Sequence, residues 1–145
     1  MRIEEARWIL DEMLALGPEV ASPVANIGSS TAEFRRNIQP HIDQCLFEPL
    51  LAAGFAVQHV DIKAADGVDI VGDICDPACL DRLRQLGFRS VICSNLLEHI
   101  VARDLFARGC EQILPSGGHI LVTVPYSYPY HADPIDTMFR PTVAE

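Results

Sequence analysis

Apolar residues along the chain gather in short runs that alternate with longer amphipathic stretches. Five runs have the length and composition of buried strands, and they cover residues 23–27, 55–62, 68–71, 90–94 and 119–124. Between and around them, apolar residues recur at helical spacing over 2–16, 31–37, 42–53, 76–86 and 95–114. Strands that alternate with helices predict an α/β fold, namely a doubly wound, mainly parallel sheet of about five strands with helices on both faces.

The order of these elements divides the chain into three parts within one domain. Residues 1–17 form an N-terminal helix, residues 23–125 form the α/β core, and residues 126–145 form an irregular tail. A length of 145 residues fits one domain with its own core. We therefore predict a single domain over 1–145.

The composition restricts the partners and the location of this domain. Hydrophobic residues make up 49% and charged residues 21% of the chain, which is typical of a globular protein. The formal net charge of −9 opposes contact with phosphate backbones, so we expect no nucleic-acid partner. No apolar run approaches the roughly 20 residues of a membrane span. The acidic N-terminal segment lacks the pattern of a signal peptide, and we expect a cytoplasmic protein.

Five scattered cysteines are more typical of reduced thiols than of a disulfide framework. Cys75 and Cys79 have the spacing of two ligands on one helical turn, but no second pair completes a tetrahedral site. We therefore expect no metal.

Polar or small residues follow the predicted strands at the edge where α/β sheets bind their ligands. Gly28 lies in the turn after the first strand, where the absence of a side chain allows a ligand to approach the backbone. Asp61 ends the second strand, and its carboxylate can accept hydrogen bonds from both hydroxyls of a ribose. This pattern predicts a site for a ligand that contains a nucleoside.

Five segments occur in an order that is similar to a known family. They are VANIGSST, HVDI, DIVGDI, VICSNLLEHI and GGHILVTVPYSYPYH, and they extend from residue 24 to about residue 131. The chain resembles the class I, Rossmann-like methyltransferases that use S-adenosylmethionine. The resemblance implies S-adenosylmethionine as the cofactor and a small-molecule or carrier-linked compound as the methyl acceptor.

The resemblance also implies a role for particular residues. Gly28, Ser29 and Ser30 would contact the methionine part of the cofactor, and Asp61 would bind the ribose hydroxyls. Asp73 would accept a hydrogen bond from the adenine amino group. The full set of implied cofactor-binding residues is Asn26, Gly28, Ser29, Ser30, Asp61, Ile62, Asp73, Ile74, Ser94 and Asn95.

The chain departs from the family pattern in two places. Asn26 stands where an acidic residue is usual, and Ser30 and Ala32 stand where glycines are usual. The family fold also continues beyond its fifth strand, whereas this chain ends at Glu145. We therefore expect a truncated member without the last strands, in which 119–124 is an exposed edge that can pair with a second copy to form a homo-oligomer.

Methyl transfer needs few catalytic groups because the sulfonium methyl is already activated. His131 and His99 are the candidates for a general base, and a solvated or structural role is the alternative for each. The departures leave a second interpretation open, in which the domain is a degenerate methyltransferase that acts as a non-catalytic binding or interaction module.

Overall fold

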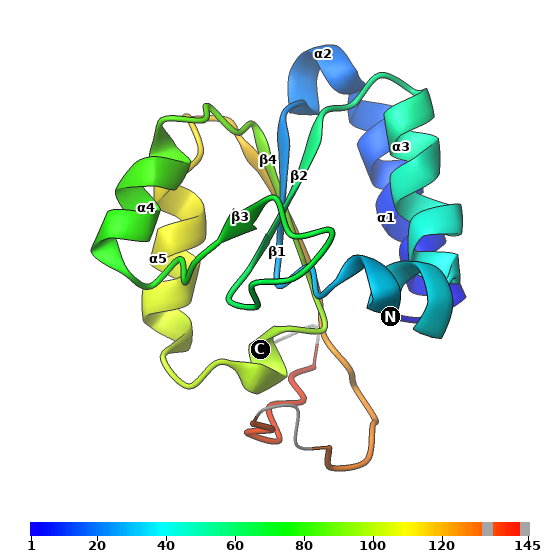
Figure 1. Cartoon of the computed structure of the whole chain (residues 1–145), viewed down its shortest axis with the longest axis vertical. Coiled ribbons are helices and arrows are strands. Elements are labelled where there is room, and N and C mark those ends of the chain that lie inside the picture. The colour runs from blue at the N-terminus through cyan, green and yellow to red at the C-terminus, as the bar shows by residue number, and fades with distance from the viewer. Residues whose placement is uncertain (132–134, 143–145) are drawn as a thin grey trace.

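The computed structural model describes residues 1–131 and 135–142, and their central feature is a five-stranded sheet (Figure 1). The strand order is β3-β2-β1-β4-β5, and every neighbouring pair is parallel. The strands are β1 (Val24–Ile27), β2 (Val57–Asp61), β3 (Ile70–Val71), β4 (Ser90–Ser94) and β5 (His119–Thr123). The predicted α/β fold with a parallel sheet is confirmed.

Helices cover both faces of the sheet, as the alternation of elements predicted (Figure 1). One face carries α1 (Ile3–Leu16), α3 (Glu48–Ala52) and the π-helical turns η1 (Phe34–Ile38) and η2 (Asp43–Phe47), and α2 (Pro18–Ala21) connects α1 to β1. The other face carries α4 (Pro77–Arg84) and α5 (Arg103–Gln112). None of the helices in the described ranges is long and apolar enough to cross a membrane.

Each face has its own apolar core. Ile9 and Met13 of α1 and Leu46 of η2 belong to one buried cluster with Val24 of β1. Leu83 of α4 and Phe106 of α5 belong to the other cluster, which contains Val91 of β4. Since β1 and β4 lie at the centre of the sheet and contribute to both clusters, these clusters fix the positions of the loops that follow the two strands.

The prediction of one helix over 95–114 is wrong in its first half. A 3-10 turn, η3 (Leu97–His99), follows β4, and α5 begins only at Arg103. In a continuous helix the Glu98 carbonyl would accept a bond from the amide four residues later. Here the backbone N–H and the hydroxyl of Thr137 donate to it instead, at 2.8 and 3.0 Å. The irregular C-terminal segment thus binds η3 and keeps its side chains at the end of the sheet.

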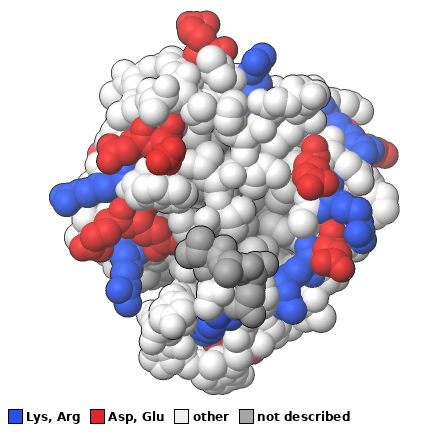
Figure 2. All heavy atoms as spheres, turned by 180° about the vertical axis from the view of Figure 1, so that it is seen from behind, with Lys and Arg blue, Asp and Glu red and all other residues white. Residues whose placement is uncertain are grey.

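Strand β5 forms one edge of the sheet, as the sequence predicted for 119–124. Its side chains Ile120 and Val122 are 40% and 43% exposed. Because β5 lies at the back of Figure 1, this edge faces the viewer in Figure 2, where charged side chains follow the two flanks and are sparse at the centre.

Candidate functional site

The carboxyl ends of the strands open into a cavity of about 1140 Å³. β2 and β3 lie on one side of β1 while β5 lies on the other side of β4, so the chain order reverses between β1 and β4. Ligands of open α/β sheets bind at such a reversal. Every site residue predicted from the sequence lines this cavity, namely Asn26, Gly28, Ser29, Ser30, Asp61, Ile62, Asp73, Ile74, Ser94, Asn95, His99 and His131.

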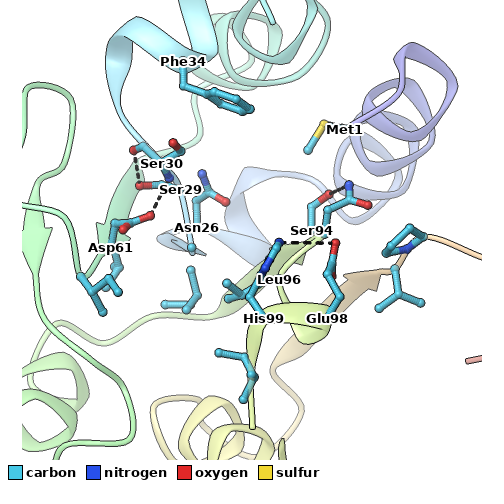
Figure 3. A pocket seen from close by; sticks show the side chains of 18 of the residues that line it. Met1, Asn26, Ser29, Ser30, Phe34, Asp61, Ser94, Leu96, Glu98 and His99 are labelled. Carbon is cyan, nitrogen blue, oxygen red and sulfur yellow. Dashed lines mark hydrogen bonds and ion pairs between the residues drawn. The ribbon is translucent and has the colours of Figure 1, made fainter. Parts of the chain in front are cut away.

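The turn after β1 and the carboxylate of Asp61 form one wall of the cavity (Figure 3). Gly28 has a φ of +75°, a conformation that favours glycine. Asp61 accepts hydrogen bonds from the backbone N–H of Ser30 at 2.7 Å and of Lys63 at 3.0 Å, one to each carboxylate oxygen. Each oxygen keeps a further lone pair for a ligand hydroxyl.

A buried arginine, which was not predicted from the sequence, hydrogen-bonds to the backbone of this turn. Arg35 is only 1% exposed. Its guanidinium donates to the carbonyls of Ser29, Ser30 and Gly67 at 3.1, 2.9 and 2.9 Å, and to the carboxylate of Asp43 at 3.3 Å. The conformation of the turn is therefore fixed before any ligand binds.

A neutral histidine, His59, lies next to the same wall. The Asn26 side-chain amide lies 3.0 Å from Nδ1 of His59 on the neighbouring strand β2. Burial, together with the positive charge of Arg35, lowers the pKa of His59 to about 4. At neutral pH the ring is uncharged, so Nδ1 is free to accept a hydrogen bond from Asn26.

This low pKa predicts that acid destabilises the protein through His59. In the unfolded chain the ring has its ordinary pKa of about 6.5, so between that pH and the folded value of about 4 the unfolded state binds more protons. We expect this group to reduce the free energy of unfolding by about 2 kcal/mol as the pH falls from 7.5 to 5. Urea denaturation at both pH values measures the effect. A His59→Gln variant should show a smaller pH dependence, and an equal one would exclude His59 as its source.

The opposite wall consists of β4, its following turn and one residue of α1. Glu5 of α1 accepts hydrogen bonds from the Ser94 hydroxyl at 3.0 Å and from the Asn95 amide at 2.7 Å. Burial raises the pKa of Glu5, but hydrogen bonds from Thr123, the Arg2 backbone and Ser94 outweigh burial, and the pKa lies below its ordinary value. Glu5 therefore carries a negative charge in the cavity wall.

The remaining predicted residues line the far end of the cavity. Ile62 is 62% exposed, whereas Ile74 is buried. The Asp73 side chain is exposed, and its carboxylate accepts a hydrogen bond from the Cys75 backbone at 2.8 Å. The exposed carboxylate of Asp73 can accept a hydrogen bond from the edge of a flat heterocycle.

The two candidate catalytic histidines lie together, although they are far apart in the sequence. The ring centroids of His99 and His131 are 5.0 Å apart, with the rings nearly perpendicular. Glu98 is 2% exposed and also lines the cavity beside His99 (Figure 3). Its burial could not be read from the local pattern, because it results from the break between β4 and α5.

Comparisons with known proteins identify no relative. No family model, no curated protein and no solved structure matches this chain.

Proposed function

We propose that the chain binds S-adenosylmethionine in this cavity and transfers its methyl group to a small-molecule or carrier-linked acceptor. The observation that carries the proposal is the position of Asp61. Its carboxylate ends β2 directly beside the turn that follows β1, and β1 is one of the two strands between which the chain order reverses. A carboxylate at this place can accept from both hydroxyls of a ribose.

The amides of the turn after β1 favour this cofactor over a ligand that carries a diphosphate. The N–H groups of Gly28 and Ser29 donate to the Val60 carbonyl, and the N–H of Ser30 donates to Asp61. A diphosphate needs such N–H groups free at the start of a helix. S-adenosylmethionine has no phosphate, so it does not need them.

The charges of the cavity also support a cationic ligand. Acidic side chains line it (Glu5, Asp61, Asp73 and Glu98) together with basic ones (Arg2, Arg35 and Lys63), and the Arg35 guanidinium is already paired with Asp43 and backbone carbonyls. Carboxylates at short range stabilise positive charge in a partly buried site. The sulfonium and the amino group of S-adenosylmethionine are both positive.

Methyl transfer in such a cavity depends mainly on positioning. The reaction requires the acceptor atom to be in line with the bond between sulfur and methyl, and it requires a free electron pair on the acceptor. The cavity volume of about 1140 Å³ can hold a nucleoside-sized ligand and a small acceptor together. His99 and His131 lie where a neutral imidazole can take a proton from an acceptor.

Isothermal titration with S-adenosylmethionine tests the proposal, and we expect saturable binding at one site. An Asp61→Asn variant keeps an oxygen for the Ser30 amide but loses the charge, and each lost charge-assisted hydrogen bond contributes about 1.5–3 kcal/mol. Binding should weaken about 10- to 100-fold. Asp81→Asn on the exposed surface of α4 is the matched control and should bind as the wild type does.

A folded wild type that shows no saturable binding would contradict the proposal. Such a result would favour the second candidate function, a non-catalytic interaction module. The exposed edge of β5, with Ile120 and Val122 on its surface, is the observation that supports this alternative. In that case the edge would pair with a second copy of the chain.

A further inference from the structure

We propose that Glu98, His99 and His131 bind a divalent transition-metal ion at the wall of the cavity. One potential ligand atom from each residue lies within 4.8 Å of the other two. Two imidazoles and one carboxylate are a donor set that suits ions such as Zn²⁺, Mn²⁺ and Fe²⁺. The sequence predicts no metal, because no second pair of ligands accompanies Cys75 and Cys79; the three residues of this cluster come from two segments that meet only in the fold.

The carboxylate of Glu98 lacks a partner that its burial requires. The side chain is 2% exposed, and its Oε2 atom is buried without any hydrogen bond. The other oxygen, Oε1, lies 3.9 Å from Nε2 of His99, which is too far for a hydrogen bond. A buried carboxylate oxygen without a partner is costly, and a cation held between these side chains would remove that cost.

Both histidines are oriented as metal ligands are. Nδ1 of His99 contacts the backbone carbonyl of Ile135, and Nδ1 of His131 lies 3.2 Å from Oδ2 of Asp136. A carbonyl or carboxylate oxygen can only accept, so each ring carries its proton on Nδ1. The lone pair of each neutral ring is then on Nε2, which is the tautomer that a metal requires.

The supporting carboxylate of Asp136 is itself firmly held. Its side chain is fully buried, and it accepts hydrogen bonds from Arg140 at 2.8 and 3.2 Å and from the backbone of His131 at 3.0 Å. Acceptors of this kind fix the ring of a ligating histidine and increase its basicity. Asp136 is therefore a positioning residue for His131.

The geometry needs only a small contraction to bind an ion. Ligand atoms about 2.0–2.2 Å from a tetrahedral Zn²⁺ are roughly 3.3 Å from one another. Rotations of three side chains, two of them on the short turn η3 and one on irregular backbone, can close the remaining gap. Three protein ligands leave further coordination positions free, as in catalytic metal sites.

Because all three residues line the cavity, those free positions are available to a bound acceptor. A metal there would bind an acceptor oxygen and lower its pKa, which would take the place of proton transfer to His99 or His131 and favours a hydroxyl-bearing acceptor. This role rests on the proposed function, whereas the binding of the metal does not.

Titration of the EDTA-treated protein with Co²⁺, in the absence of S-adenosylmethionine, tests the site. We expect one equivalent to bind, with a visible spectrum typical of nitrogen and oxygen ligands and without a thiolate charge-transfer band. Added Zn²⁺ should displace Co²⁺. Because no cofactor is present, the result does not depend on whether S-adenosylmethionine binds.

Variants assign the ligands. Glu98→Gln and His131→Ala should each weaken Co²⁺ binding about 100-fold or more, and Asp136→Asn should weaken it about 10- to 100-fold. His119→Gln, at the amino end of β5, is the matched control and should bind as the wild type does. Circular dichroism identifies any variant that fails to fold. The proposal is wrong if the folded wild type binds no Co²⁺ up to millimolar concentration, if Glu98→Gln and His131→Ala bind it as tightly as the wild type, or if the spectrum shows thiolate ligation.

Discussion

Replacement of Arg35 by methionine is expected to lower the free energy of unfolding by about 3–5 kcal/mol. The substitution keeps most of the volume of the side chain but removes its charge and its donors. It leaves the Asp43 carboxylate, which is 6% exposed, without the bond from Arg35, and it leaves the carbonyls of Ser29, Ser30 and Gly67 without the donors that now bind them. The removal of one partner from a buried network costs more than the network contributes as a whole.

Arg36→Met is the matched control for this experiment. Arg36 forms an ion pair with the same carboxylate at 3.0 Å, but its side chain is 63% exposed. Exposed pairs contribute about 0–1 kcal/mol. Urea denaturation measures the free energy of unfolding of both variants. The comparison shows how much a buried and an exposed arginine each contribute when both pair with Asp43. Equal losses of stability would show that the bonds from Arg35 to the turn have no special importance.

Replacement of Gly28 by alanine is expected to cost about 3 kcal/mol through two separate effects. The first is backbone strain, because a residue with a side chain must adopt a φ of +75°. The second is steric, because the new Cβ atom would lie 2.6 and 2.7 Å from the Cδ atoms of Leu96. Leu96 is partly buried and packs against the second apolar core, so its side chain must shift away from the new methyl group.

Two further variants separate these effects. Gly117 has a φ of +82°, and a Cβ atom there would meet nothing within 4 Å, so Gly117→Ala measures the strain alone. Leu96→Ala in the Gly28→Ala background makes space for the new methyl group. A double-mutant cycle by thermal denaturation should therefore show favourable coupling between the two substitutions. Additive losses would mean that Leu96 does not oppose a side chain at residue 28.

The strands could be predicted from the sequence because each is an apolar run with a turn residue close to its end. β1, β4 and β5 begin and end within one residue of the predicted ranges. The third run was harder to delimit: β3 contains only Ile70 and Val71, and Val71 is 44% exposed. The helical spacing of apolar residues over 95–114 wrongly predicted one continuous helix. Leu97 and Ile100 pack against the core although the helix does not extend over them.

The candidate site was predictable as far as it depends on the ends of strands. Gly28 directly follows a strand and Asp61 is the last residue of one, and parallel strands bring such residues to one edge. Glu5 and Arg35 were not predictable, because their roles depend on contacts that no local pattern encodes. Glu5 contacts residues 89 and 90 positions away, and Arg35 reaches Gly67 across the fold.

The central position of β1 has a consequence for the order of folding. β1 pairs with β2 through one crossover, residues 28–56, but its other partner is β4, which follows two further crossovers. Contacts between residues far apart in sequence form slowly, because the intervening chain must lose entropy first. An intermediate that contains only β1, β2 and β3 has the wall with Asp61 and lacks the wall with Ser94 and Glu98. A ligand that contacts both walls therefore requires the pairing of β4 with β1, which brings the two walls together.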